Sequence, residues 1–289
     1  MSSERWELLR ALGAVAGDPA DAVKVLSALD LPGCDDAAHT AVFVLNCPPY
    51  ASVYLGAEGG LGGSAADRVA GFWRAIGLAP PAEPDHLTVL LSLYAQLGER
   101  WEEAGRASDS QATAALGHAR QALFAEHLWT WLPGYLAAVA DLGTPALSTW
   151  ASVLGRALAA EHAGSSQAAA PPALPLALRE APAPVDAGCS LGELLDVLTA
   201  PVRSGMIVTR QALAVIAGRA GAGHRIGERR FALRAMLEQE PDGTRGWLAE
   251  EASRWAKRHR AAAPHDPVQQ WWSTRARTTA EVLSAPGIS

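Results

Sequence analysis

The sequence of 289 residues predicts an all-α protein, and three observations support this fold class. Alanine and leucine dominate the composition, whereas runs of the β-branched residues that favour strands are scarce. Through most of the chain, apolar residues recur at the three- and four-residue spacing of amphipathic helices. Proline, aspartate, serine and threonine stand at positions where successive helices should begin.

The first half of the chain predicts successive amphipathic helices. Asp18-Pro19 should cap and start the second helix, and the third must stop near Cys47-Pro48-Pro49. Ser64 should cap the helix that follows a glycine-rich loop from Gly56 to Gly63. That loop lacks the Lys-Ser/Thr ending of a phosphate-binding Walker loop, so we expect a mobile flap. The predicted helices lie near residues 6–12, 18–29, 41–45, 64–76, 84–104, 110–128, 133–142 and 145–158.

Composition changes beyond residue 165 and predicts three parts. Residues 1–165 form a helical bundle domain, residues 166–189 form a linker rich in proline and alanine, and residues 190–289 form a smaller, basic helical extension. In the extension, Ser190 and Glu193 have capping-box spacing. Its helices are expected near 191–199, 210–220, 228–239, 244–260 and 267–284, with Thr209, Thr244 and Asp266 as natural N-caps.

Charge is unevenly spread along the chain. Residues 1–199 carry 10 basic and 22 acidic residues, whereas residues 200–260 carry 12 basic and six acidic ones. An acidic body should attract a basic peptide and repel nucleic acid. The basic stretch is either a solvated face or a surface for an acidic partner.

Several classes of protein are disfavoured by what the sequence lacks. The amino terminus shows no export signal and no apolar stretch is long enough for a membrane helix, so we expect a cytoplasmic protein without membrane insertion. Cys34, Cys47 and Cys189 are odd in number and widely spaced, which predicts neither a disulfide framework nor a zinc site. No serine-nucleophile elbow or paired-histidine metal motif is present, so we expect a protein that is not an enzyme and needs no cofactor.

The segment Glu83-Pro84-Asp85-His86-Leu87 stands at the start of the predicted helix 84–104. Proline at a helix start fixes φ and sacrifices no needed amide. Asp85 would then place its carboxylate beside the free amides and the positive end of the helix dipole. This arrangement leaves His86 in the first turn, close to solvent.

A second signature follows about forty residues later, with His127, Trp131 and Pro133 in the segment His127-Leu128-Trp129-Thr130-Trp131-Leu132-Pro133. Together with the turn Pro49-Tyr50-x-Ser52-x-Tyr54-Leu55 and the pair Phe72-Trp73, these motifs make residues 5–165 resemble the TorD/DmsD family of molybdoenzyme maturation chaperones, within the NarJ-like superfamily. The residues before Pro84, Ala82-Glu83, depart from the family pattern. Many members also lack an extension of about a hundred residues.

The resemblance implies a cytoplasmic chaperone with an all-helical TorD-like domain. Such proteins bind the twin-arginine leader of the catalytic subunit of a molybdopterin oxidoreductase and assist cofactor insertion before export. The resemblance admits proteins of molybdenum cofactor biosynthesis as further partners and leaves a homodimer open. It does not name the client enzyme. The residues that it assigns to the peptide site are Glu83, Pro84, Asp85 and His86, with Trp73, Tyr54, His127 and Trp131 as groove neighbours.

Each of these residues also has a structural interpretation. Asp85 could pair with a leader arginine or cap a helix, and His86 could donate to a peptide carbonyl or bond within its loop. His127 is more typical of a buried, satisfied histidine, and the hydroxyls of Tyr50 and Tyr54 would pin the glycine-rich loop.

Two other functions remain open from the sequence. One is a DNA-binding regulator, in which Arg229, Arg230 and Arg234 lie on a recognition helix after the Gly221–Gly227 turn. The other is a stable accessory subunit of the same oxidoreductase.

Overall fold

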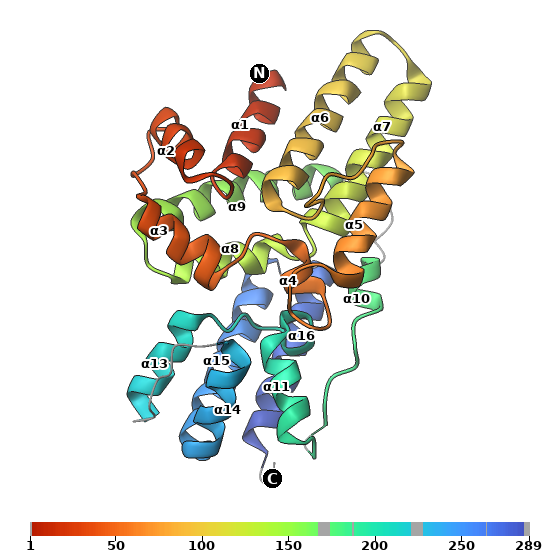
Figure 1. Cartoon of the computed structure of the whole chain (residues 1–289). Helices are drawn as coiled ribbons and strands as arrows, with labels where there is room; N and C mark the ends of the chain where they lie inside the picture. The colour runs from red at the N-terminus through yellow and green to blue at the C-terminus, as the bar shows by residue number, and fades with distance from the viewer. Residues whose placement is uncertain (1, 167–173, 187, 221–227, 264, 286–289) are drawn as a thin grey trace. The chain divides into compact units, whose positions relative to one another are not determined.

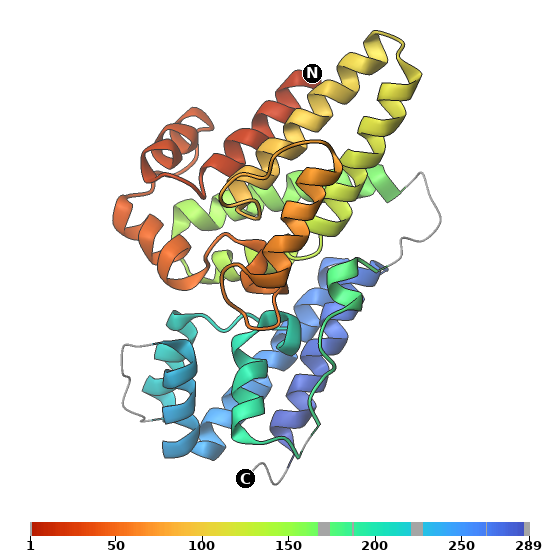
Figure 2. The same ribbon diagram turned by 45° about the vertical axis from the view of Figure 1, so that its right-hand side comes forward.

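A computed structural model describes residues 2–166, 174–186, 188–220, 228–263 and 265–285 (Figures 1 and 2). Over these residues the chain is helical and holds no strand, which confirms the all-α prediction. The chain divides into two compact units. Unit 1 comprises Met1–Ser52 and Leu61–Pro175, and unit 2 comprises Val53–Gly60 and Leu176–Ser289.

Unit 1 is a helical bundle built around the long helix α6 (Leu87–Arg106), which packs against α1 (Ser2–Ala14) and α7 (Ser110–Ala122) (Figure 2). Helix α8 (Leu132–Asp141) packs against α9 (Pro145–Ser166). The remaining elements of unit 1 are α2 (Pro19–Ala28), α3 (Asp36–Thr40), the π-helix η1 (Ala41–Asn46), α5 (Gly63–Ala75) and the π-helix η2 (Leu123–Leu128). The short helix α4 (Ala51–Leu55) begins in unit 1 and continues into the segment assigned to unit 2.

The core of unit 1 forms because α6 carries apolar residues at helical spacing. Leu87, Leu90, Leu91 and Leu97 are buried, as the periodicity predicts. Gly98 lets α1 approach α6 closely, since a Cβ at this position would lie 2.5 Å from the indole of Trp6. The bundle is therefore held by close packing of α1 on α6.

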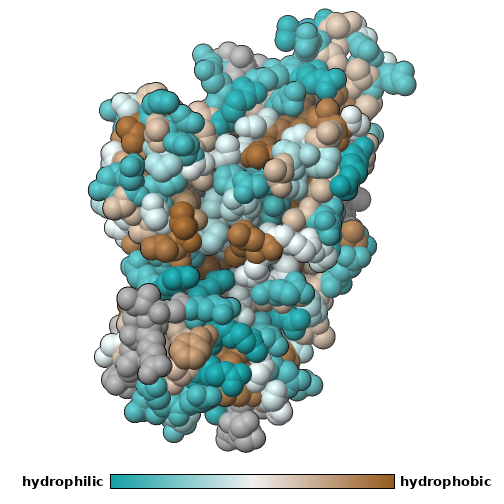
Figure 3. All heavy atoms as spheres, viewed as in Figure 1, coloured by the Kyte–Doolittle hydropathy of each residue, from teal (hydrophilic) through white to brown (hydrophobic). Residues whose placement is uncertain are grey.

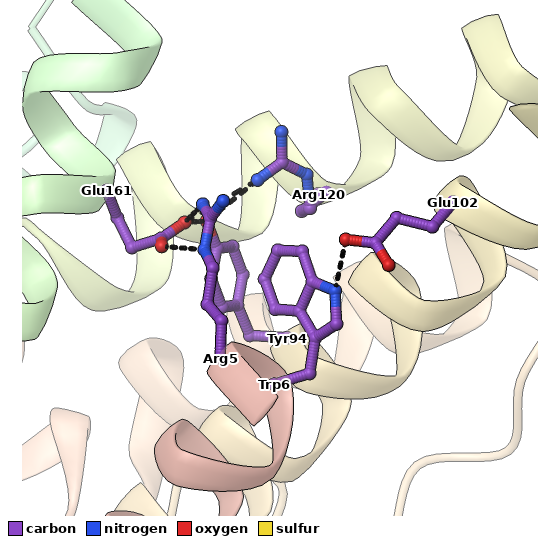
Figure 4. Close-up of polar contacts among 6 residues, drawn as sticks. All are labelled: Arg5, Trp6, Tyr94, Glu102, Arg120 and Glu161. Carbon is purple, nitrogen blue, oxygen red and sulfur yellow. Dashed lines mark hydrogen bonds and ion pairs between the residues drawn. The ribbon is translucent and has the colours of Figure 1, made fainter. Parts of the chain in front are cut away.

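A buried carboxylate also ties four helices of unit 1 together (Figure 4). Glu161 of α9 is 5% exposed and accepts two hydrogen bonds from the guanidinium of Arg5 on α1. The hydroxyl of Tyr94 on α6 donates to the same carboxylate at 2.6 Å, and Arg120 of α7 lies 3.6 Å from it. The guanidinium of Arg120 also lies over the ring of Trp101, 5.0 Å from the ring centroid.

Unit 2 is organised by the antiparallel pair α15 (Pro241–Ala262) and α16 (Pro267–Ser284). Gly205, at φ +75°, ends α12 (Pro201–Ser204), and a Cβ there would lie 2.3 Å from the backbone nitrogen of Ala276 on α16. The remaining helices of this unit are α10 (Leu176–Arg179), α11 (Leu191–Thr199), α13 (Arg210–Ala220) and α14 (Arg229–Gln239). Unit 2 therefore contains the predicted extension 190–289 together with Val53–Gly60 and residues 176–189, part of the predicted linker.

Most predicted caps of unit 2 are confirmed. Ser190 and Glu193 form the capping box, and the side chains of Thr209 and Asp266 accept hydrogen bonds from the amides of Ala212 and Val268. The prediction for Thr244 was wrong. It lies inside α15, which begins at Pro241, and its buried hydroxyl donates to the carbonyl of Met236 at 3.1 Å.

Three other predictions were wrong in part, and two fall on residues that the structure does not describe. Helix α6 begins at Leu87, three residues later than predicted, and the predicted helix 110–128 becomes π-helical from Leu123. Gly62, and not Ser64, is the N-cap residue of α5. The Gly221–Gly227 turn of the DNA-binding interpretation and most of the linker's 166–173 stretch lie outside the described residues.

Among the described helices, none combines the length and the apolar character that a membrane crossing requires. Across the described ranges, no cluster of three or more His, Cys, Asp or Glu side chains is arranged to hold a metal ion.

Candidate functional site

The turn that begins at Pro49-Tyr50 and the 83–87 motif meet in space, although about 33 residues separate them along the chain. The amide of Ala51 donates to the carbonyl of Asp85 at 3.1 Å, and the amide of Leu87 donates to the carbonyl of Pro49 at 2.8 Å. These two bonds form an isolated antiparallel bridge between Tyr50 and His86. The motifs therefore build one structural junction at the start of α6.

Asp85 does not cap the helix that follows it, contrary to the prediction. Its side chain is 3% exposed, and its carboxylate accepts a hydrogen bond of 2.9 Å from the amide of Ser52, in the first turn of α4. His86 is the N-cap of α6, where Nδ1 accepts from the amide of Thr88 at 3.2 Å. The reason is the bridge to Tyr50, which keeps residues 85 and 86 out of helical geometry.

The buried position of Asp85 leads to a stability prediction. Replacing Asp85 by alanine leaves the Ser52 amide without its partner, so we expect the free energy of unfolding to fall by about 2 kcal/mol. Urea denaturation measures the change. The matched control is Asp109→Ala at the exposed N-cap of α7, where the expected loss is about 1 kcal/mol or less. Equal losses for the two variants would contradict the positioning role of Asp85.

Tyr50, Glu83 and His86 form the outer side of this junction. The ring of Tyr50 meets the ring of His86 edge-on, with centroids 4.7 Å apart, and its hydroxyl donates to Glu83 at 2.9 Å. Burial and the carboxylate of Glu83 raise the pKa of Tyr50 to about 12. Burial lowers the pKa of His86, so this imidazole is neutral at pH 7 and can accept the Thr88 amide.

His127 and Trp131 lie in the core of unit 1. They are 6% and 2% exposed, and the indole of Trp131 donates to the carbonyl of His127 at 2.8 Å. The ring of His127 lies 5.2 Å from that of Phe72. Burial and the charge of Arg68 lower the pKa of His127 to about 4. The histidine is therefore kept neutral inside the bundle.

This depressed pKa predicts a pH-dependent stability. The unfolded chain protonates His127 near pH 6.5 and the folded chain only near pH 4, so its contribution is present above pH 6.5 and is lost as pH falls. When the pH falls from 7 to about 4.5, the free energy of unfolding of the wild type decreases. We expect the decrease to be about 2 kcal/mol smaller in His127→Gln. Urea titrations at both pH values measure this. His265→Gln, at an exposed site, should keep the wild-type decrease, and an unchanged pH profile in His127→Gln would contradict the assignment.

Tyr54 is 2% exposed and belongs to the Val53–Gly60 segment, which is assigned to unit 2. Glu83, Pro84, Asp85 and His86 form the junction within unit 1.

A groove of about 470 Å³ opens on unit 1 next to this junction. One face of α6 forms its floor, and Trp73 of α5 and Pro81 of the α5–α6 loop form one wall. The indole nitrogen of Trp73 is buried and makes no hydrogen bond within the described part of the chain. The residues that α6 contributes are Thr88, Val89, Ser92, Leu93, Gln96 and Glu99.

An ion pair lies at the far end of the groove from His86. Arg10 of α1 donates to Glu99 at 2.8 Å, and both side chains are about 40% exposed. Thr88, two residues after His86, marks the near end, where its hydroxyl donates to the carbonyl of Gly13 at 2.8 Å. Within unit 1, Figure 3 shows apolar side chains interrupting a mostly hydrophilic surface. The groove thus offers mixed polar and apolar contacts along α6.

Sequence reasoning identified Trp73 but missed the floor of the groove. The missed residues of α6 recur at helical spacing beside the buried stripe of Leu87, Leu90, Leu91 and Leu97. A second, partly apolar face next to a core stripe is the available signal for such a floor.

The comparison with known families supports the identity of this unit. Residues 26–137 match the family model described as nitrate reductase delta subunit. This part of unit 1 is therefore similar to the NarJ-like superfamily of redox enzyme maturation proteins. The matched range contains Trp73, the 83–86 motif, His127 and Trp131, and it ends before unit 2 resumes at Leu176. No curated protein and no solved structure matches the chain.

The matched family indicates the class of protein that unit 1 resembles. Proteins of that family are maturation chaperones and accessory subunits of molybdoenzymes. The arrangement at the groove agrees with that role, since it can hold another chain through packing and hydrogen bonds.

Proposed function

We propose that the protein is a cytoplasmic chaperone whose unit 1 groove binds the N-terminal leader of a molybdopterin oxidoreductase catalytic subunit. The observation that carries this proposal is the groove of about 470 Å³ beside the 83–86 junction, in a unit that matches the nitrate reductase delta subunit family over residues 26–137. The leader would be held while the client receives its cofactor, and released for export afterwards.

The charge of unit 1 supports a basic ligand. This unit carries nine basic and 17 acidic residues, a net charge of −8. A twin-arginine leader brings two guanidinium groups, which an acidic surface attracts over several ångströms. Glu83 is exposed at the junction, and Glu99 lines the groove, where it pairs with Arg10 and stays about 40% exposed.

The predicted site residues divide into two roles under this proposal. Glu83 is exposed, and Trp73, Pro84 and His86 are half-buried, so they are assigned to the wall and the near end of the groove. The side chains of Asp85, His127 and Trp131 are buried, so we assign them to positioning the junction and the bundle beneath it. Binding in the groove then depends on Asp85 indirectly, through the Ser52 amide.

The size of the groove suits reversible binding. Burying about 300 Å² of apolar area provides about 7 kcal/mol before the ordering of the peptide is subtracted. Before that subtraction, this free energy corresponds to a dissociation constant of roughly 10 μM, and the ordering of the peptide weakens the binding further. A chaperone that hands its client to the export machinery needs an affinity of this order.

Calorimetry with leader peptides tests the proposal. We expect saturable binding of a molybdoenzyme leader from the same genome, with Trp73→Ala weakening it by about tenfold or more. Phe231→Ala, which removes a half-exposed aromatic ring of unit 2, is the matched control and should leave the affinity within about twofold. Absence of binding to every molybdoenzyme leader of the same genome would contradict the proposal.

A further inference from the structure

A second pocket lies wholly within unit 2, and most of its lining residues follow the range matched by the family model. Its volume is about 460 Å³, which falls in the range of small-molecule sites. One wall is the backbone of the Gly59-Gly60 step, and another is Thr199 at the end of α11. Three arginines converge on it from α12 and α14: Arg203, Arg229 and Arg230.

The protein holds each of these arginines in place. Nε of Arg203 donates to the carbonyl of Ala57 at 2.7 Å, and Arg229 donates to the carbonyl of Gly59 at 3.3 Å. Arg230 forms an ion pair with Asp196 on α11. Guanidinium groups that are already oriented lose little conformational entropy when they bind a ligand. The hydrogen-bond donors of the pocket are therefore held in place before a ligand binds.

Glycine is required at position 59 for this arrangement. Its φ is +63°, and a Cβ would lie 2.3 Å from the carbonyl oxygen of Thr199. The 57–60 segment can consequently bring its backbone against α11 and supply the carbonyls that anchor Arg203 and Arg229. This tight packing replaces the mobile flap expected from the sequence.

The electrostatics of the pocket favour an anion even though Glu58, Asp196 and Glu228 also line it. These three acidic side chains are exposed, whereas the three arginines are half-buried, so water screens the acids more strongly. Arg275 of α16 is 8% exposed and adds positive charge behind Arg203. Burial and the neighbouring charge of Arg203 lower the pKa of Arg275.

The start of α14 adds a further source of donors. Glu228, Arg229 and Arg230 belong to both the pocket wall and the first turn of this 11-residue helix. The side chain of Glu228, its N-cap residue, makes no capping hydrogen bond in the described structure. The first turn of α14 and the positive end of its dipole therefore lie at the pocket wall, where they favour a negative group.

We propose that this pocket of unit 2 binds a small molecule that carries a phosphate group. A planar guanidinium group pairs with phosphate oxygens through two parallel hydrogen bonds. Three guanidinium groups and the start of a helix match the several oxygens of a phosphate better than the two oxygens of a carboxylate. The concave shape and the volume favour a small phosphate ester or diphosphate over an extended polyanion.

Calorimetry on the full chain with inorganic pyrophosphate tests this site. We expect saturable binding that Arg229→Gln weakens by about tenfold or more, and that Arg203→Gln abolishes at the same concentrations. Arg277→Gln removes an exposed arginine of α16 that pairs with Glu281, and it should change the affinity by less than about twofold. Sodium sulfate at matched ionic strength should not displace pyrophosphate at equal concentration.

One further variant and one further ligand complete the calorimetric test. Arg203→Lys keeps the charge and loses the planar fork, so it should bind more weakly than wild type while its thermal melt shows a folded protein. Adenosine triphosphate in place of pyrophosphate distinguishes a nucleotide site, which binds it more tightly, from a site for the phosphate group alone. Absence of saturable binding, or equal weakening in Arg277→Gln, would overturn the proposal. Leader binding in unit 1 is measured separately and is unaffected by either outcome.

Discussion

Replacing Glu161 by alanine is expected to lower the free energy of unfolding by about 3 kcal/mol or more. The carboxylate is 5% exposed, and its removal leaves Arg120, whose side chain is 13% exposed, beside the hydroxyl of Tyr94 without the negative charge (Figure 4). Losing one partner of a buried ion pair is costly because the remaining charge stays desolvated. Helices α1, α6, α7 and α9 would lose their shared contact.

Urea denaturation of Glu161→Ala measures this loss. The control is Glu99→Ala, which removes the carboxylate of the Arg10–Glu99 pair, where both side chains are about 40% exposed. Exposed pairs contribute about 1 kcal/mol or less, so this variant should stay close to wild type. If both variants lose equal stability, the buried cluster does not hold the bundle.

Replacing Gly59 by alanine should destabilise the protein by about 2–4 kcal/mol, because two costs add. An L-residue at φ +63° is strained, and the new Cβ would lie 2.3 Å from the carbonyl oxygen of Thr199. The segment would have to move away from α11, and Arg203 and Arg229 would lose the carbonyls of Ala57 and Gly59. Pyrophosphate binding, if present in the wild type, should weaken as well.

The neighbouring residue provides the control for this variant. Gly60→Ala places its Cβ in open space, so its free energy of unfolding should stay within about 1 kcal/mol of wild type. Thermal and urea unfolding measure the stability of the two variants. Equal stability of Gly59→Ala and wild type would show that the 57–60 segment does not pack on α11.

The sequence predicts the helical framework well because helix formation depends on local spacing. The stripe of Leu87, Leu90, Leu91 and Leu97 is visible in the sequence and is buried in the structure. The caps at Ser190, Thr209 and Asp266 follow from neighbouring residues alone. These features require no knowledge of distant parts of the chain.

The errors arise where distant segments decide the local structure. Asp85 caps α4 because the 49–52 segment pairs with it, and no local pattern around residue 85 reports that pairing. The glycine-rich segment suggests mobility, yet Gly59 packs against Thr199, 140 positions along the chain. The π-helices η1 and η2 keep nearly the same apolar periodicity as α-helices, so the sequence does not distinguish them.

The residues of the groove also divide into those that the sequence predicts and those that only the fold brings together. Trp73 was predicted from the family motif, but Val89, Ser92 and Gln96 carry no motif and become a site only when α5 and the α5–α6 loop form a wall beside them. His127 and Trp131 were predicted as groove neighbours because they share the family signature, and the structure places their side chains in the core. A family motif marks residues that shape a site as well as residues that touch its ligand.

Site-specific photo-crosslinking tests the central claim, that the α6 groove of unit 1 holds the client leader. A photoreactive residue is placed at Ser92 on the floor of the groove, and at Val215, a half-exposed position on α13 of unit 2, as the control. The account predicts that the leader peptide crosslinks to position 92 and that excess unlabelled leader abolishes the product. Crosslinking at position 215 with none at position 92 would contradict it.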